Sequence, residues 1–353
     1  MAATTHDTPI DPAELRAWTE GVLRATGASL PAAAATTDAL MSATRRGFDS
    51  HGVEYLHFYL PKLRSGVTPG DAHPHVVLDL PALAVVDGNA AMGAYVATYA
   101  MTLACDKAKE SGAGIVSVRN SSHFGAASVY SELATEQGCI GIAMSNSDPG
   151  MAPEGALAPV LGTNPIAIAA PPGTEGVTPS LDMAASVVAF SHVIRAARAD
   201  KPIPAGWAIG PDGRPTEDAS AALQNSVVPF GGHKGFALAF MIDVLAGCLS
   251  GGSTSQEIVV EHPEMEGPQG TAHLFIAIHL DSVSERSEYE ASLDRLIESV
   301  HGAPKAPWAN EMMFPGEPEH RASAERSDGI PIRADALAML RVLGEEYGLT
   351  FPI

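Results

Sequence analysis

The sequence predicts an α/β fold, and three observations carry this prediction. Short apolar runs bounded by Gly, Asn and Pro alternate with longer helical segments through the middle of the chain. A chain of 353 residues is long enough to bury a large core. Its composition, 46% hydrophobic and 18% charged, is that of a globular protein and not of a disordered one.

Two helices are predicted near the start. Asp11 is a good N-cap, Pro12 suits the first helical turn, and Glu14 completes a capping box, so the first helix starts here and ends at Gly27. The second helix is predicted over residues 30–46.

Aromatic residues follow at helical spacing in the segment 47–66. Tyr55, Phe58, Tyr59 and Leu63 recur on one face of a helix. We interpret Phe58 and Tyr59 as ordinary core residues.

Strands and helices alternate from Val76 onward. Strands are predicted within the short apolar runs 82–93, 114–120, 138–147, 164–172 and 273–280. The predicted helices are 94–111, 126–137, 183–198, 234–249, 287–301 and 334–347, with Pro-rich turns or loops at 201–218 and 314–320.

Charge and cysteine content narrow the class of protein. Asp and Glu number 41 against 21 Lys and Arg, for a net charge of −20, which repels nucleic acid and anionic membranes. Cys105, Cys139 and Cys248 form no CxxC pair, so neither a structural zinc site nor a disulfide framework is expected. The first 18 residues resemble no signal peptide, and the longest apolar stretch, 235–249, is too short to span a membrane. We therefore expect a cytoplasmic protein.

Several common catalytic motifs are missing. The chain has no GxGxxG and no GxxxxGK[ST], so the usual dinucleotide and Walker phosphate loops are excluded. It has no GxSxG and no HExxH, which argues against a serine hydrolase and a zinc protease. We expect no metal site.

Two histidines lie in polar, Gly-flanked loops. His51 follows Ser50 in DSHG, and His123 stands between a predicted strand and a helix, in SSHFG. Ligands of α/β proteins usually bind at such strand-to-helix turns, and histidine exchanges protons near neutral pH. For either residue alone a structural hydrogen bond is the commoner role, but two such residues in one chain favour an active site.

Three further segments could hold a ligand. The run 146–172 is rich in small and amide residues, and Asn146, Ser147 and Asn164 could supply hydrogen bonds, although spacing alone favours simple turns. Asp182 is a plausible N-cap of the helix predicted to follow it, and GGHKG with Lys234 opens another helix. Exposed helix amides and a lysine suit a pyrophosphate, but each is also a common helix start.

As an ordered set, these segments resemble the malate/L-lactate dehydrogenase family that lacks a Rossmann fold, which includes ureidoglycolate dehydrogenase, diketogulonate reductase, sulfolactate dehydrogenase and piperideine-2-carboxylate reductase. The matching motifs span nearly the whole chain. They are RGFDSHG, SSHFGAA, NSDPGMAP with LGTNP, DMAAS, IPAGWA with DGRPT, GGHKGFAL with DVLAGCLSGG, and FPGEPEHR followed by DGI.

The resemblance implies an unusual non-Rossmann mixed-sheet cofactor domain, with helical lobes from the N- and C-terminal segments. We expect residues 1–75 and 303–353 to share one lobe. Residues 76–302 would form the α/β cofactor-binding domain, with a helical subregion near 183–255. Members of the family are typically homodimers, and they use NAD or NADP.

The resemblance also assigns roles to residues. His51 and His123 match residues to which acid–base chemistry is assigned in different relatives, and we favour His51 as the proton donor. Arg46 and Ser50 lie beside it as substrate-binding candidates. The positions that match nicotinamide-cofactor contacts are Ser147, Asn164, Asp182, Met183, Ala184, Lys234 and Gly316.

Two positions depart from the family pattern. Tyr55 replaces an arginine that is expected to hold the substrate carboxylate, so Arg46 or another group takes over, or the substrate differs. A common Gly-Lys pair is replaced within Phe190-Ser191-His192. Because this region borders the cofactor site, the choice between NAD and NADP stays open.

The sequence thus predicts an NAD(P)-dependent enzyme that transfers a hydride between nicotinamide and a small 2-oxo or 2-hydroxy acid. The alternative is an imine reductase for cyclic or N-alkyl 2-imino acids, since the Tyr55 ring would suit a cationic iminium. A third hypothesis is a catalytically inactive binding protein with the same fold.

Overall fold

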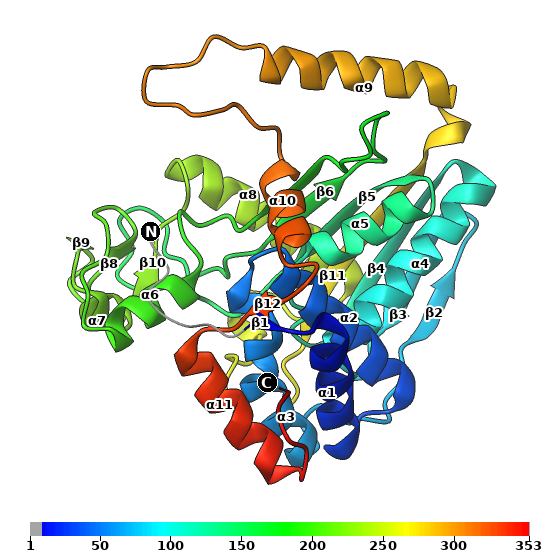
Figure 1. Ribbon diagram of the computed structural model, residues 1–353. Coiled ribbons are helices and arrows are strands. Elements are labelled where there is room, and N and C mark those ends of the chain that lie inside the picture. Colours follow the sequence, from blue (N-terminus) through cyan, green and yellow to red (C-terminus); the bar gives the residue numbers. More distant parts are fainter. Residues whose placement is uncertain (1–8, 353) are drawn as a thin grey trace.

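A seven-stranded mixed sheet forms the centre of the protein in the computed structural model, which describes residues 9–352 (Figure 1). The strand order is β2-β3-β4-β11-β5-β6-β7, and only β3 and β4 run parallel. The strands are β2 (His75–Asp79), β3 (Leu83–Asp87), β4 (Ala113–Ser121), β5 (Cys139–Ser145), β6 (Ile166–Ala169), β7 (Ser180–Met183) and β11 (Thr271–His279). The predicted α/β fold with a mixed sheet is confirmed.

Both faces of the sheet are covered. Alternate residues of β4, such as Val116 and Val118, pack in one core with α4 (Gly93–Ser111) and α5 (Ser128–Glu136). The opposite face, including Leu274 of β11, packs against α8 (His233–Asp243), which continues as a π-helical turn, η3 (Val244–Cys248). Strands buried on both sides explain why these runs are continuously apolar in the sequence.

The two ends of the chain meet in a second core. The helices α1 (Pro12–Ala25), α2 (Leu30–Arg45), α3 (Leu56–Ser65) and α11 (Ala334–Glu346) lie together below the sheet in Figure 1. Strand β1 (Pro9–Ile10) pairs with β12 (Ile330–Pro331), and Trp18 packs edge-on against the Phe351 ring with centroids 4.6 Å apart. The lobe expected from residues 1–75 and 303–353, which extends beyond the described residues at both ends, stays a prediction.

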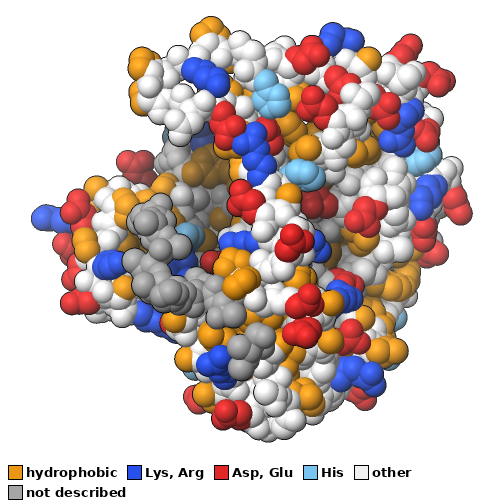
Figure 2. Space-filling view, viewed as in Figure 1, with side chains coloured by type: hydrophobic (Ala, Val, Ile, Leu, Met, Phe, Trp, Pro, Cys, Tyr) orange, Lys and Arg blue, Asp and Glu red, His pale blue; other side chains and the backbone are white. Residues whose placement is uncertain are grey.

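Smaller elements project from this frame. A three-stranded sheet of β8 (Ala208–Ile209), β9 (Pro215–Thr216) and β10 (Ser226–Val227) lies beside α6 (Phe190–Arg198) and α7 (Ala219–Ala222). On the far side of the sheet, α9 (Arg286–His301) connects through a long loop to α10 (Glu317–Glu325) (Figure 1). The face of the molecule in Figure 2 is hollowed between this loop and the smaller elements. Four single 3-10 turns are η1 (Asp49–His51), η2 (Val53–Tyr55), η4 (Ser255–Glu257) and η5 (Leu280–Ser282).

Several local predictions need correction. The helix predicted over 183–198 starts only at Phe190, because residues 180–183 pair with β6 as strand β7. Asp182 is therefore not an N-cap. The loop predicted at 314–320 contains the start of α10, and the predicted turns at 201–218 contain β8 and β9.

Other predictions hold in part. The carboxylate of Asp11 accepts hydrogen bonds from the amides of Ala13 and Glu14 at 2.8 and 2.9 Å, as an N-cap does, but no bond from the Glu14 side chain closes a capping box in residues 9–352. Tyr59 is buried as expected, whereas Phe58 is only partly buried. Within the same range, no helix combines the length and apolar character needed to cross a membrane.

Candidate active site

Most of the predicted site residues lie at one end of the main sheet, beyond the ends of its strands. Strands β4, β5 and β7 stop at this end and β6 begins there, as the pairing of Met144 with Ile166 and of Ile166 with Met183 shows. His123, Ser147 and Asn164 stand just beyond these strand ends, next to Asp182 and Met183 of β7. The antiparallel pairing brings these residues together from separate parts of the sequence.

The two candidate histidines meet at this end of the sheet. The rings of His51 and His123 are nearly parallel, with centroids 5.6 Å apart. The Tyr55 ring stacks on His123 at 4.5 Å and lies 6.0 Å from His51. The turns η1 and η2, which follow α2, thus place the rings of His51 and Tyr55 against His123 in the loop after β4.

His123 is held by groups that the sequence did not indicate. The hydroxyl of Tyr59 lies 2.9 Å from Nδ1 of His123, and the His123 amide donates to Oε1 of Gln269 at 2.7 Å. A small cavity behind the ring is lined by Tyr59, Lys62 and Ser122, among others. Burial, then the nearby His51, Lys62 and His273, holds the pKa of His123 well below its usual value. His123 is therefore neutral at pH 7.

His51 lies in a different electrostatic setting. Its Nδ1 is 2.9 Å from the Ser50 hydroxyl, which can donate to it and leave the proton on Nε2. Burial lowers the pKa of His51, while the negative charge of Asp182 raises it. Of the two histidines, only His51 has a carboxylate that favours its protonated form.

The carboxylate of Asp182 is fixed by the start of α5. The amide and hydroxyl of Ser128 donate to it at 2.9 and 2.6 Å. Arg46 donates to the same hydroxyl at 3.0 Å and forms an ion pair with Glu132 at 2.7 Å. The structure therefore gives Arg46 a partner within the protein and connects it to the site through Ser128.

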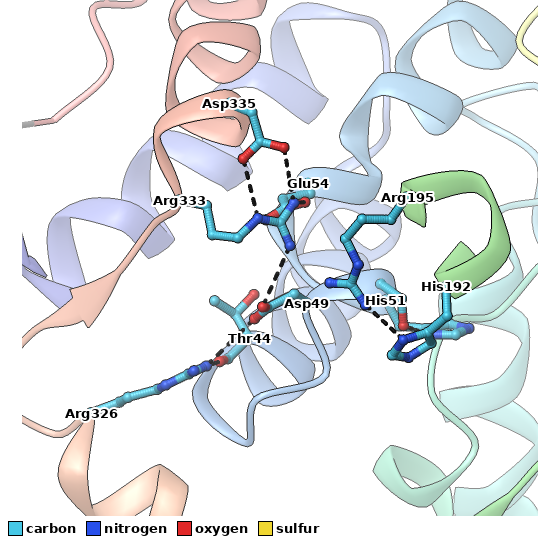
Figure 3. Close-up of polar contacts among 10 residues, drawn as sticks. Thr44, Asp49, His51, Glu54, His192, Arg195, Arg326, Arg333 and Asp335 are labelled. Carbon is cyan, nitrogen blue, oxygen red and sulfur yellow. Dashed lines mark hydrogen bonds and ion pairs between the residues drawn. The ribbon is translucent and has the colours of Figure 1, made fainter. Parts of the chain in front are cut away.

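A second cluster of charges supports the loop that carries His51 (Figure 3). Arg333 lies 2.9 Å from Glu54 and 3.7 Å from Asp49, and Arg326 lies 3.7 Å from Asp49. Burial raises the pKa of Glu54 to about 7, even though Arg333 opposes this shift. Residues near the C-terminus thus fix the position of the histidine loop.

The predicted cofactor positions form a connected surface beside the histidines. The Ser147 amide donates to the Asn164 side chain at 3.0 Å, and Asn164 in turn donates to the Ala239 carbonyl of α8 at 2.8 Å. Asn164 is fully buried, whereas Ser147, Met183 and Ala184 are only partly buried. Asn164 is therefore placed to shape the loop, and the partly exposed residues are placed to contact a ligand.

The start of α8 packs directly against this surface. A Cβ on Gly235 would lie 2.6 Å from the Ala185 carbonyl, so only glycine allows this close approach. Gly231 and Gly232 have positive φ angles of 56° and 62° and are exposed. Lys234 is also exposed, and no carboxylate pairs with it in residues 9–352.

These groups fit a dinucleotide. The exposed start of α8 and a lysine without an ion-pair partner supply the positive charge that a phosphate needs. Gly316 lies apart from the other predicted cofactor positions, near the opposite end of β7. It caps α10 with φ 98°, and a Cβ added to it would lie 2.6 Å from the Thr178 carbonyl. No group of three or more His, Cys, Asp or Glu in residues 9–352 could hold a metal ion.

Sequence reasoning missed several residues of the site. Tyr59 was interpreted as core only, although it is both buried and hydrogen-bonded to His123. Glu54 lies just after RGFDSHG but is not one of its residues, and Gln269 comes from a segment without any motif. The one available signal was a tyrosine in a core helix, since a buried hydroxyl usually has a partner.

Comparison with known proteins agrees with this geometry. The malate/L-lactate dehydrogenase family profile matches residues 10–341. L-sulfolactate dehydrogenase of Methanocaldococcus jannaschii is 36% identical over 329 residues, which cover 93% of this chain and 94% of that protein. A solved structure of sulfolactate dehydrogenase from Methanocaldococcus jannaschii aligns with a TM-score of 0.89 and 35% identity over 98% of each chain.

Two more relatives show the range of the family. Malate dehydrogenase of Entamoeba histolytica aligns with a TM-score of 0.93 at 28% identity over 99% of this chain and 100% of that one. The Δ1-pyrroline-2-carboxylate/Δ1-piperideine-2-carboxylate reductase of Pseudomonas syringae pv. tomato is 38% identical over 265 residues, covering 74% of this chain and 76% of that protein. From the sheet, the paired histidine loops and these matches, we conclude that the chain belongs to the malate/L-lactate dehydrogenase family.

Proposed function

We propose that this protein reduces a small 2-oxo acid to the 2-hydroxy acid, and catalyses the reverse oxidation. Its family makes it an NAD(P)-dependent oxidoreductase. The observation that carries the proposal is the stack of His51, His123 and Tyr55 beside the predicted cofactor surface. Named relatives act on sulfolactate, malate and lactate, all of which are 2-hydroxy acids.

A nicotinamide cofactor, when bound here, would supply the hydride to the carbonyl carbon, or accept it in the reverse reaction. We assign the matching proton to His51, which delivers it to the carbonyl oxygen as negative charge develops there. Asp182 favours the protonated form of His51, and Ser50 orients the ring. His123 stays neutral and can donate a hydrogen bond from Nε2 to the same oxygen, since the Tyr59 hydroxyl is placed to donate to Nδ1.

The cofactor would lie along the surface of Ser147, Met183 and Ala184. Lys234 and the start of α8 would hold a phosphate, and Asn164 would act through the Ser147 loop. Gly316 lies at the far end of β7, so a contact there would involve a more distant part of the cofactor. The choice between NAD and NADP is open, and one relative is named as NADP-dependent.

Imine reduction is the second candidate, and Tyr55 favours it. The Tyr55 ring lies against His123 at 4.5 Å, where an arginine is expected from the family pattern. An aromatic face attracts a cationic iminium, and one relative is a reductase of cyclic imino acids. An inactive binding protein is disfavoured by the intact histidine pair.

We also propose that the protein works in the cytoplasm and as a homodimer. The absence of disulfide-pattern cysteines supports a reducing compartment. Size-exclusion chromatography with light scattering tests the dimer, and a monomer mass would exclude it.

The testing experiment follows oxidation of NADH, and separately NADPH, with a panel of 2-oxo acids and cyclic imino acids. Wild type should oxidise one cofactor with one subset. His51→Ala should lower kcat by about 100-fold or more, and His123→Ala should also lower it. His279→Ala is the matched control, because His279 is a partly buried histidine whose Nδ1 contacts Ser282, remote from the histidine pair. Near-normal turnover by both active-site variants would exclude this mechanism.

A further inference from the structure

The candidate site needs a cation for a carboxylate substrate, and most cations around it already have acidic partners. Arg46 pairs with Glu132, and Lys62 pairs with Glu261. These pairs are largely buried, so each charge is offset within the protein.

The cations under the histidine loop are also paired. Arg333 contacts Asp49, Glu54 and Asp335, and Arg326 contacts Asp49. Neither arginine is therefore a strong candidate for an incoming anion.

Arg195 differs from all four. It lies on α6, across from η1 and η2, and in Figure 3 its guanidinium reaches toward the loop that carries Asp49 and His51. Its positive charge lowers the pKa of Glu54, which agrees with this placement. Yet in residues 9–352 no carboxylate lies within ion-pair distance of Arg195.

The one polar partner of Arg195 in this range is a neutral ring. Its Nη2 lies 2.8 Å from Nδ1 of His192, one turn earlier on α6. Because a guanidinium only donates, Nδ1 must accept, which leaves the proton on Nε2. The His192 ring lies edge-on to Trp207, with centroids 6.3 Å apart. His192 thus orients the guanidinium without neutralising its charge.

The acidic groups nearby do not cancel this cation. Asp49 and Glu54 both contact Arg333, and burial raises the pKa of Glu54 to about 7. The charge of Arg195 therefore remains available to an anion that enters between α6 and the histidine loop.

We propose that Arg195, held in place by His192, binds the carboxylate of the substrate. This proposal rests on the proposed function. Tyr55 has no positive charge with which to bind the substrate carboxylate, and Arg195 of α6 would supply that charge instead. A carboxylate bound there would direct its 2-oxo or 2-imino carbon toward His51. Arg195 is then a substrate-binding residue, and His192 a positioning residue.

The first test compares a 2-oxo acid with its primary amide, which has nearly the same size but no charge. Arg195→Met should raise KM for the acid on the order of 10- to 100-fold, with a smaller change in kcat and unchanged KM for the cofactor. The preference of wild type for the acid over the amide should shrink by a similar factor. The KM of Arg195→Lys for the acid should lie between those of wild type and Arg195→Met.

Two further variants sharpen the result. Arg198→Met removes a positive charge from the same helix one turn later, and it should leave the acid-to-amide preference unchanged. His192→Phe should raise KM for the acid. His192→Asn keeps an acceptor for Arg195, so its KM for the acid should stay close to that of wild type. An unchanged preference in Arg195→Met, or an equal loss in Arg198→Met, would overturn the assignment.

Direct binding separates this proposal from the proposed function. Calorimetry with oxamate, an unreactive analogue of a 2-oxo acid, in the presence of reduced cofactor should show binding to wild type and weaker binding to Arg195→Met. If wild type neither binds oxamate nor turns over any acid, both proposals fail. If wild type does both and Arg195→Met matches it, only the role of Arg195 fails.

Discussion

The hydroxyl of Tyr59 lies 2.9 Å from Nδ1 of His123, although the two residues are 64 positions apart. Tyr59 belongs to α3 and its ring is part of the terminal core, while His123 follows a strand of the main sheet. One side chain thus connects the packing of the terminal helices to the tautomer of a candidate active-site histidine.

Tyr59→Phe tests this connection. The ring stays in the core while the bond to His123 is lost, so we expect kcat to fall about tenfold. The free energy of unfolding should fall by about 1–3 kcal/mol, because the buried Nδ1 of His123 loses its partner. Steady-state kinetics and thermal unfolding measure the two effects. Tyr99→Phe is the control, since its hydroxyl makes no described hydrogen bond, and equal kcat in both variants would contradict the role of Tyr59.

Asp182→Asn tests the electrostatic support of His51. The charge of Asp182 raises the pKa of His51, so its removal should lower that pKa further. If protonated His51 is the donor, activity is lost as pH rises through this pKa. The alkaline limb of the kcat–pH profile should therefore move to lower pH in Asp182→Asn. Asp294→Asn, remote from the site, should leave the limb in place.

Glu54→Gln tests the buried carboxyl under the histidine loop. Burial raises its pKa from 4.5 to about 7 in the folded protein. The folded state therefore holds this proton more tightly than the unfolded state, and the resulting stability is present below pH 4.5 and lost as pH rises through 7.

Glutamine has no such proton to lose. Relative to wild type, the free energy of unfolding of Glu54→Gln should increase between pH 5 and pH 8, by roughly 3 kcal/mol at most. Urea unfolding at the two pH values measures this. Glu346→Gln, at an exposed ion pair, should show little change, and a Glu54→Gln effect of opposite sign would refute the buried-carboxyl account.

Gly235→Ala tests the contact between α8 and the predicted cofactor surface. The added Cβ would lie 2.5 Å from the Phe230 carbonyl and 2.6 Å from that of Ala185. Overpacking of this kind costs about 1–3 kcal/mol, and it should also weaken cofactor binding by displacing residues 184–186. Gly267→Ala, where nothing lies within 4 Å of the Cβ position, should change neither unfolding nor binding.

Local patterns predicted much of the fold because they depend on nearby residues. Asp11 marks its helix start through bonds to the next residues, and the apolar runs of β4, β5 and β11 reflect burial on both faces. Strand β7 was missed because its polar Asp182 is stabilised by Ser128, 54 positions away. The loop predicted at 314–320 is wrong at the start of α10, where the proline after Glu317 is a common helix-start signal.

The site was predictable only where a short motif carried it. His51 and His123 stood out through their Gly-flanked loops, and the structure brings them together. Glu54, Tyr59 and Arg195 belong to no motif, because their environments are created by elements that are distant in sequence. Their pairing with Arg333, His123 and the histidine loop needs three-dimensional packing to be seen.

The pairing of β1 with β12 also bears on how the enzyme is made. Strand β11 lies in the middle of the seven-stranded sheet and is synthesised after the other six strands. Arg333 and β12 come later still. A nascent chain on the ribosome therefore holds both histidines long before the residues that fix the His51 loop have emerged. A chain that stops before β12 therefore lacks the contacts of Arg333 with Asp49 and Glu54 that hold this loop.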